Sequence, residues 1–294
     1  MRQRNWPWLR SKAINLHQKR LEIQTKLQEK DDDFPGNVAL VLISHVLGKP
    51  KSWILSHGDY QLSQSETNTL QKLTDQYLQG VPLPYLLGHW DFFGRTYKIT
   101  PHVFIPRPET EMLVEKALNY LQKFNYPRIV DVGTGSGIIA ISLAVEYPSA
   151  TITAVDISLP ALQVAQHNAR QHKQTQVQFL QAHLLTPLQR KFDLICANLP
   201  YIPSKTLEKL TLSDWEPRLA LDGGEDGLDR IEEMIQQART RLASPGVLLL
   251  EIEANQGKAS MKIAKTHFPD AYCQVYQDLA GRDRLIRVHN TASI

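Results

Sequence analysis

Cysteine is nearly absent from this 294-residue sequence, which holds only Cys196 and Cys273. Two thiols cannot build a disulfide scaffold or a zinc site made of cysteines, and the ten histidines show no H-E-x-x-H or comparable spacing. We therefore expect no metal site. No apolar run approaches the ~18–20 residues of a membrane helix, so we expect no membrane as a partner.

A large excess of charge is also missing, because 33 Lys and Arg face 30 Asp and Glu. The surplus of +3 is too small for non-specific binding over the whole surface, and nucleic acid is not an expected partner. Apolar residues make up 42%, close to the average of soluble globular proteins. We expect a monomer in the cytoplasm. Eight basic and two acidic side chains among the first 30 residues leave import into an organelle open, beside a plain surface helix over residues 9–27.

The length allows two domains of about 150 residues, and the sequence pattern changes along the chain. Residues 1–80 show helical spacing of apolar side chains, for example from Ala39 to Leu47 before Gly48, and from Leu70 to Leu78 before Gly80. Residues 81–110 are rich in Pro, Gly and aromatic residues. This composition is too apolar for a flexible linker, so we predict an ordered connection that packs between the domains.

Residues 111–294 form the second predicted domain. From about residue 128 onward, short β-branched runs alternate with helical segments. The predicted strands are 129–132, 151–155, 177–180, 192–197, 247–252, 271–276 and 284–289. The predicted helices are 138–145, 160–171, 229–242 and 256–267. Such alternation is typical of an α/β fold. We predict a Rossmann-like, doubly wound and mostly parallel sheet with an antiparallel C-terminal strand, preceded by a small all-helical domain.

A glycine-rich turn follows the first of these strands. It consists of Gly133, Thr134, Gly135, Ser136 and Gly137, and a predicted helix comes directly after it. Glycines allow a tight turn and close approach of the backbone to a ligand, and the helix start offers free N–H groups. Asp156 ends the second strand, where a carboxylate can accept hydrogen bonds from both hydroxyls of a ribose. Together these features favour a ligand of the adenosine type.

The spacing of the glycines narrows the choice of ligand. It is G-x-G-x-G, whereas dinucleotide folds generally carry the third glycine one place later. Asp131, two residues before the first glycine, would repel a pyrophosphate but suits the positive charges of S-adenosylmethionine. We favour this methyl donor; a dinucleotide and a purely structural turn stay open.

A second motif, Asn198-Leu199-Pro200-Tyr201, lies at the end of the predicted strand 192–197. Ligands of open α/β sheets bind at this edge. Pro200 forces Leu199 toward an extended shape, so its carbonyl can point into a cleft beside the Asn198 side chain. Two acceptors can hold both hydrogens of a planar –NH₂ group, and Tyr201 offers a flat face for stacking. The alternative is a stiff loop without chemistry.

These acceptors suit methylation of an amide or aromatic amine, whose nitrogen lone pair is delocalised. Holding the two hydrogens aims the lone pair at the methyl group and stabilises the positive charge that develops on nitrogen. Asn198, Pro200 and Tyr201 are therefore the predicted catalytic residues. Most of the acceleration would come from positioning.

At these residues the sequence resembles the release factor glutamine methyltransferase family (PrmC/HemK) of class I methyltransferases. The resemblance covers nearly the whole chain and includes the segments 82–88, 104–111, 129–137, 192–203, 216–228 and 278–284. It implies that the enzyme uses S-adenosylmethionine to methylate the side-chain amide of glutamine in the Gly-Gly-Gln loop of peptide chain release factors. Residues 111–294 would be the methyltransferase domain and residues 1–80 the part that recognises the substrate.

The resemblance also implies roles for single residues. The glycine-rich turn, Asp156 and Asn198 would contact the donor, beside Asp131 from the charge argument above. The motif from Asn198 to Tyr201 would bind the glutamine amide, with Phe104 close by. The sequence departs from the family at Leu199, where the family carries a proline, and at His183, where many relatives carry an acid near the adenine. His183 is a predicted donor contact, with an exposed loop histidine as the alternative. Two alternatives remain at this stage: an amino-methyltransferase acting on adenine in nucleic acid, and a non-catalytic binding module on the same fold.

Overall fold

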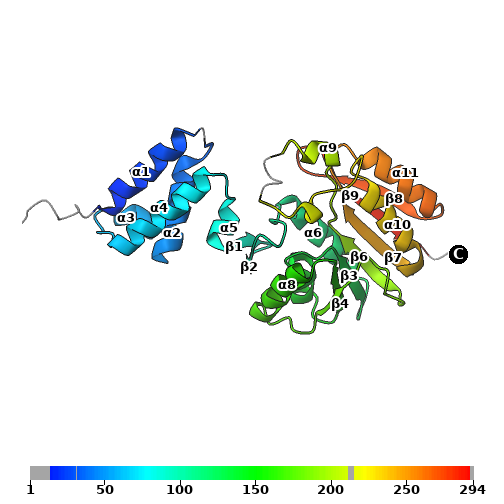
Figure 1. Ribbon diagram of the computed structural model, residues 1–294. Helices are drawn as coiled ribbons and strands as arrows, with labels where there is room; N and C mark the ends of the chain where they lie inside the picture. The colour runs from blue at the N-terminus through cyan, green and yellow to red at the C-terminus, as the bar shows by residue number, and fades with distance from the viewer. Residues whose placement is uncertain (1–13, 31, 211–214, 292–294) are drawn as a thin grey trace, which may run out of the picture. The chain divides into compact units, whose positions relative to one another are not determined.

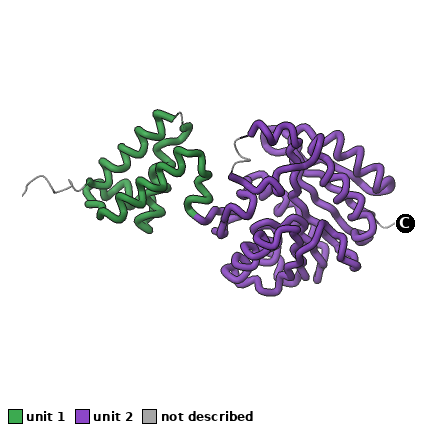
Figure 2. The backbone as a smooth tube through the Cα atoms, in the orientation of Figure 1, with its two compact units in different colours: residues 1–87 green, residues 88–294 purple. Residues whose placement is uncertain are grey.

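The computed structural model describes residues 14–30, 32–210 and 215–291. The chain divides into two compact units, residues 1–87 and residues 88–294, which Figure 2 shows in different colours. The boundary falls inside the segment 81–110. Each unit has a hydrophobic core of its own.

The first unit is built from helices, as predicted. These are α1 (Leu16–Gln28), α2 (Pro35–Leu47), α3 (Lys51–Ser56), α4 (Gln64–Leu78) and α5 (Leu83–Leu87). Asn15 and Ser63 cap α1 and α4 through reciprocal bonds with Gln18 and Glu66, which satisfies free N–H groups at each helix start. The cap at Asn15 makes α1 begin at Leu16. Leu9 and Ala13, which we placed in a helix over residues 9–27, lie outside the described residues.

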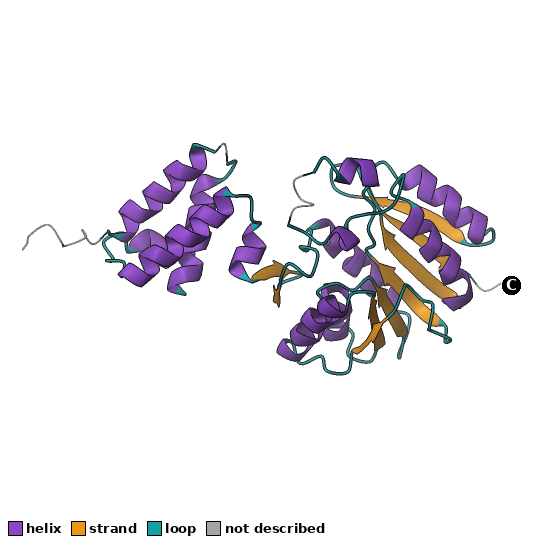
Figure 3. Cartoon of the chain, in the orientation of Figure 1, coloured by secondary structure: helices purple, strands orange, loops and turns teal. Residues whose placement is uncertain are grey.

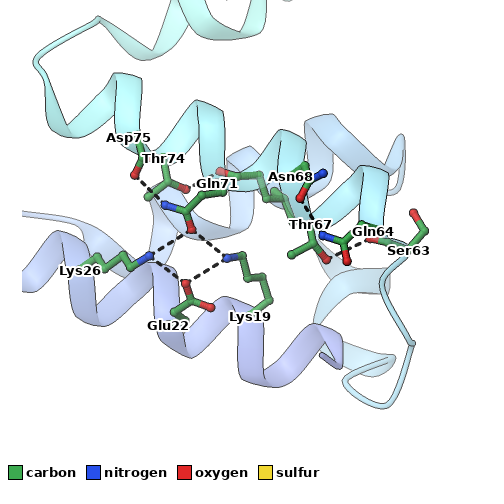
Figure 4. Close-up of polar contacts among 11 residues, drawn as sticks. Lys19, Glu22, Lys26, Ser63, Gln64, Thr67, Asn68, Gln71, Thr74 and Asp75 are labelled. Carbon is green, nitrogen blue, oxygen red and sulfur yellow. Dashed lines mark hydrogen bonds and ion pairs between the residues drawn. The ribbon is translucent and has the colours of Figure 1, made fainter. Parts of the chain in front are cut away.

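A polar network joins α1 to α4, as Figure 4 shows. The buried Lys19 reaches Glu22 at 3.0 Å and Gln71 at 3.3 Å, and Lys26 reaches the same two oxygens at 2.8 and 3.1 Å. The Gln71 amide donates in turn to Asp75 at 2.7 Å. The charged groups of this network therefore have partners, as partly buried charges require.

The second unit begins with a hairpin, β1 (His89–Phe92) and β2 (Arg95–Lys98), which packs on two helices of the same unit. The hydroxyls of Tyr97 and Ser142 lie 2.9 Å apart. The Lys98 N–H donates to the Asn168 side chain at 2.8 Å. The hairpin is thereby fixed to helices that follow it by 40 to 70 residues.

The seven-stranded sheet of this unit confirms the predicted α/β fold. Its strands are β3 (Arg128–Val132), β4 (Thr151–Asp156), β5 (Gln178–Gln181), β6 (Phe192–Ala197), β7 (Leu242–Glu251), β8 (Tyr272–Gln277) and β9 (Asp283–Asn290). They lie in the order β5-β4-β3-β6-β7-β9-β8, and β9 runs antiparallel to both neighbours. The predicted antiparallel C-terminal strand is therefore confirmed.

Helices flank the strands of this sheet (Figures 1 and 3). One set of neighbours is α6 (Glu109–Leu121), α7 (Ile138–Glu146) and α8 (Leu159–Gln171), and another is α10 (Asp229–Arg241) with α11 (Gly257–His267). Short turns, α9 (Ser204–Leu207) and η3 (Arg218–Ala220), lie between β6 and α10. Among the described helices, none is long and apolar enough to cross a membrane.

The strand order creates a crevice between β3 and β6. From β3 the chain proceeds outward to β4 and β5, and then returns to place β6 on the other side of β3. Ligands of open α/β sheets bind where the order reverses in this way. Val132 pairs with Ala197, so the glycine-rich turn and the motif that begins at Asn198 leave the sheet side by side.

Candidate active site

A cavity of about 260 Å³ opens at the carboxyl ends of β3, β4 and β6. Most of the predicted site residues line it: Phe104, Gly133, Thr134, Gly135, Ser136, Asp156, His183, Asn198, Leu199, Pro200 and Tyr201. Asp131 and Gly137 do not belong to the lining. The fold thus brings together residues that are almost a hundred positions apart in the sequence.

The glycine-rich turn is held in place by hydrogen bonds to the end of β4, at Val155 and Asp156. The N–H groups of Gly133 and Thr134 donate to the Val155 carbonyl at 2.8 and 2.9 Å. Asp156 accepts the Gly135 N–H at 2.8 Å through one oxygen, and the Ser158 N–H at 2.9 Å through the other. Burial raises the pKa of Asp156, and these backbone hydrogen bonds lower it.

Positive φ angles explain the glycines of this turn, at +72° for Gly133, +55° for Gly135 and +84° for Gly137. A Cβ on Gly137 would also come within 2.9 Å of Ile141 and 3.1 Å of Ala165. Gly137 therefore serves the packing of the first turn of α7, whereas Gly133 and Gly135 face the cavity.

Asp131 is fully buried and supports the turn from outside the lining. It accepts the Thr134 hydroxyl at 2.6 Å and the Ala140 N–H at 3.1 Å. Burial raises its pKa to about 7, although these two hydrogen bonds lower it. Its second oxygen, Oδ1, has no hydrogen-bond partner among the described residues. In this structure the carboxylate joins the turn to the start of α7.

Leu199 connects the two predicted motifs. Its side chain is buried in the core, and a Cβ on Gly133 would lie only 3.0 Å from Leu199 Cδ2. The side chain therefore packs directly under the glycine-rich turn. The departure from the family's proline places a larger, flexible apolar group at this contact.

The backbone after Leu199 is fixed by groups from elsewhere in the unit. The Tyr201 carbonyl accepts the Gln256 amide at 3.0 Å. Gly227 lies so close that a Cβ there would be 2.2 Å from the same carbonyl oxygen. Burial, followed by the charge of Glu251, raises the pKa of the Tyr201 phenol, so this ring stays neutral at physiological pH.

The rim of the cavity carries Phe104, which is positioned through Arg107 and Glu216. The Arg107 guanidinium lies 4.7 Å from the centre of the Phe104 ring, a cation–π contact. Glu216, whose side chain is fully buried, pairs with Arg107 and accepts the Ile105 N–H at 3.0 Å. Arg107 therefore braces this edge of the cavity.

His183 lines the cavity as well, and its side chain is 41% exposed. Its Nε2 lies 2.6 Å from the Glu233 carboxylate on α10. One ring nitrogen is therefore engaged with α10.

Sequence reasoning missed Thr110, Gln256 and Glu251 as parts of this region. Thr110 is buried at the start of α6, lines the cavity and accepts the Asn198 side-chain N–H at 3.1 Å. Glu251 is buried at the end of β7. One signal was available, since an acid that ends an apolar run such as Val247–Leu250 stands at the edge where ligands bind.

The residues present suit an adenosine-type donor with positive charge. Each Asp156 oxygen accepts one N–H and keeps a further lone pair for a ribose hydroxyl. A Cβ on Gly135 would meet nothing closer than a carbonyl oxygen at 4.0 Å, so this glycine leaves space toward the cavity. The lining is mostly apolar with a few polar groups, as expected for a small-molecule site.

Comparison with known proteins agrees with this arrangement. Residues 20–88 match the family described as PrmC N-terminal domain, and residues 109–213 match the family described as Methyltransferase small domain. A release factor glutamine methyltransferase of Moorella thermoacetica is 40% identical over 253 residues, which are 85% of this chain and 89% of the relative. A protein of the same name from Coxiella burnetii is 39% identical over 251 residues, 84% of this chain and 89% of the relative.

Solved structures are similar in fold. A 16S rRNA methyltransferase of T. thermophilus, in complex with AdoMet and guanosine, aligns with a TM-score of 0.51 at 17% identity. The alignment covers 69% of this chain and 49% of the other. At this identity the likeness concerns the fold alone.

Proposed function

The chain belongs to the release factor glutamine methyltransferases, and we propose that its substrate is the glutamine of the Gly-Gly-Gln loop in peptide chain release factors. The enzyme is an S-adenosylmethionine-dependent methyltransferase, and the methyl group goes to the side-chain amide nitrogen. One observation carries the proposal for the site. Asp156 with the glycine-rich turn and Asn198 with its neighbours open into the same cavity.

The donor end of this cavity is formed by the glycine-rich turn and Asp156. In the proposed assignment Asp156 accepts the ribose hydroxyls, and the apolar lining surrounds the base. His183 remains a candidate contact of the adenine through its place in the lining. S-adenosylmethionine, when bound, supplies an electrophilic methyl group.

The acceptor end is formed by Asn198, the Leu199 carbonyl and the ring of Tyr201. The two oxygens accept the two hydrogens of the glutamine –NH₂, and the ring packs against the planar amide. Phe104, braced by Arg107, closes the adjacent edge. Positive charge that develops on the amide nitrogen is stabilised by the two acceptors, and the proton becomes acidic after transfer, so no strong base is needed beforehand.

A protein substrate is favoured over adenine in nucleic acid. Enzymes that act on a base in a duplex must extrude it, which calls for a basic surface beside the cavity. Among the described residues that line this cavity, Arg230 is the only Lys or Arg. The helical unit, residues 1–87, is proposed to hold the release factor, since the predicted catalytic and donor motifs all lie in the second unit.

Incubation of the protein with labelled S-adenosylmethionine and one of three acceptors tests this proposal. The acceptors are purified release factor, the same factor with glutamine of the Gly-Gly-Gln loop replaced by glutamate, and adenine-containing DNA. We expect label only on the first. Label on DNA would favour the nucleic-acid alternative, and no label with any acceptor would favour a binding module.

Substitution of Asn198 tests the assignment of the acceptor end. Asn198→Ala removes one of two proposed hydrogen-bond acceptors, so single-turnover transfer should fall by about 10²–10³ while donor affinity changes little. Gln174→Ala, in the segment after α8, is a control that removes an amide outside the cavity lining. A near wild-type rate for Asn198→Ala would make Asn198 an ordinary loop residue.

A further inference from the structure

We propose that Glu251 is a positioning residue, which sets the end of the Asn198 side-chain amide that faces the substrate. The inference rests on the proposed function, because it concerns the acceptor that Asn198 offers to the glutamine –NH₂. Glu251 does not line the cavity and would act entirely through Thr110 and Asn198.

The sheet places Glu251 beside Asn198. Ala197 of β6 pairs with Leu250 of β7 in parallel register, so the next residues, Asn198 and Glu251, stand at the same level. Glu251 is 3% exposed. Thr110, also buried, comes from the first turn of α6 and receives the Asn198 Nδ2–H at 3.1 Å. Thr110 and Asn198 therefore lie together in the cavity wall, with the buried Glu251 beside them.

The orientation of an asparagine amide depends on its partners, because its oxygen only accepts and its nitrogen only donates. An ionised carboxylate only accepts as well. Between Glu251 and Thr110 the Thr110 hydroxyl has to be the donor, and its oxygen then accepts a hydrogen from Asn198. This directional chain turns Nδ2 of Asn198 inward. The Oδ1 atom is left for the cavity, where the substrate –NH₂ needs an acceptor.

The causes of the pKa shift at Glu251 agree with this direction. Burial raises the pKa of Glu251, whereas hydrogen bonding from Thr110 and Asn198 lowers it; the net pKa is raised to about 7. Both hydrogen-bond effects have the sign expected when Thr110 and Asn198 donate toward the carboxylate. The charged and titratable groups that face Glu251 are Glu109, which raises its pKa, Arg284, which lowers it, and the neutral Tyr201.

Protonation of Glu251 would remove this directional constraint. A neutral carboxyl group can donate its own hydrogen to the Thr110 oxygen, which frees the Thr110 hydroxyl to donate to Asn198. Asn198 can then turn its oxygen inward and present –NH₂ to the substrate, where two donors would meet. The ionised form of Glu251 is therefore the active one.

A purely structural reason for this carboxylate is weak. Its Oε2 atom has no hydrogen-bond partner among the described residues. Burying a charge with an unsatisfied oxygen costs free energy of folding, and an apolar residue of similar volume is generally tolerated at least as well. The position of Glu251 is better explained by its effect on Asn198 than by stabilisation of the fold.

The test is single-turnover methyl transfer to release factor at saturating donor, measured from pH 6 to pH 9 in the full chain. The wild-type rate should rise through about pH 7, as Glu251 ionises. Glu251→Gln, nearly the same in shape, can orient its amide either way. Its rate at pH 8 should fall at least about tenfold, though less than on loss of Asn198 itself, and the rise near pH 7 should disappear.

Three further variants separate this role from a general effect on structure. Thr110→Val removes the hydroxyl between Glu251 and Asn198 and should lower the transfer rate as Glu251→Gln does. Thr110→Ser keeps the hydroxyl and should retain most of the wild-type rate. Glu253→Gln removes a carboxylate two positions away, outside the cavity lining, and should leave the rate and its pH profile as in the wild type. Calorimetry should give the same donor affinity for the wild type and all four variants.

The outcomes distinguish this inference from the proposed function. A wild-type protein that transfers no methyl group to release factor would overturn both. An active wild type, with Glu251→Gln equal to it in rate and pH profile, would overturn the role of Glu251 alone. An equal loss in Thr110→Ser and Thr110→Val would also contradict it, because the hydroxyl would then be irrelevant.

Discussion

The close approach of Gly227 to Tyr201 allows a sharp test of how the site is held. Gly227 has φ of +81°, and a Cβ there would lie 2.2 Å from the Tyr201 oxygen and 2.7 Å from the Gln256 amide nitrogen. Gly227→Ala therefore adds left-handed strain of about 1–2 kcal/mol and overpacking of about 1–3 kcal/mol. We expect the free energy of unfolding to drop by about 2–5 kcal/mol in total.

The loss of activity should exceed what this destabilisation explains. To reach an ordinary contact, the Tyr201 carbonyl has to move by about 1 Å, and the backbone that follows Asn198 moves with it. A misplacement of that size can cost about 10²-fold in rate. Single-turnover transfer should therefore fall by about 10²-fold under conditions where the variant is folded, while donor binding at Asp156 stays nearly unchanged.

Gly281→Ala is the matched control. Gly281 has φ of +74° but nothing within 4 Å of the added Cβ, so this variant carries the backbone strain without the collision. Urea unfolding and single-turnover assays on both variants provide the comparison. Equal losses of stability, together with full activity in Gly227→Ala, would refute the claim that Gly227 positions the Tyr201 backbone.

Three other substitutions test separate parts of the site. Asp156→Ala removes the proposed ribose acceptor and should weaken donor binding by about 1.5–3 kcal/mol in calorimetry; an unchanged affinity would contradict that assignment. Glu216→Ala leaves the Ile105 N–H without its acceptor and should reduce the free energy of unfolding by about 1–3 kcal/mol, with a higher KM for release factor. Asp131 has a folded pKa of about 7 against 3.8 unfolded, so the folded state holds its proton longer and the wild type loses stability as pH rises between these values. Asp131→Asn should be free of this loss, so its free energy of unfolding relative to the wild type should improve from pH 4 to pH 7 in urea unfolding of the donor-free protein. If the two proteins show the same dependence of stability on pH, the raised pKa of Asp131 is excluded as the cause of the loss.

Much of the second unit could be predicted from local patterns. Apolar runs of strand length alternate with helical segments, and parallel strands put their carboxyl ends on one edge. Because of that geometry, the glycine-rich turn after β3, Asp156 at the end of β4 and Asn198 after β6 could be predicted to lie together from the sequence alone. The start of β7 was not predicted: the predicted strand begins at residue 247, and Ser244, Pro245 and Gly246 before it are residue types typical of turns. The sheet nevertheless extends through them, and Leu242 pairs with Phe192 before an irregularity in the register.

Short helices and long-range polar contacts lay beyond the sequence pattern. Helix α3, Lys51–Ser56, is too short to display a helical period, and α5 contains Pro84. The contact between Glu216 and Ile105 spans 111 positions, and the one between Asn198 and Thr110 spans 88. Nothing in a single sequence indicates which distant partner a buried polar side chain finds, because that choice follows from how distant segments pack against one another.

The contact between Leu199 and Gly133 has a consequence for redesigning acceptor choice. Leu199 belongs to the hydrophobic core and packs against Gly133 at the floor of the cavity. A substitution there therefore disturbs the donor end and the acceptor end together. The rim is different, since Leu219 is 57% exposed and Phe104 is held from outside through Arg107. A combinatorial library confined to Phe104 and Leu219 would therefore sample new amide-bearing acceptors on an unaltered donor-binding floor.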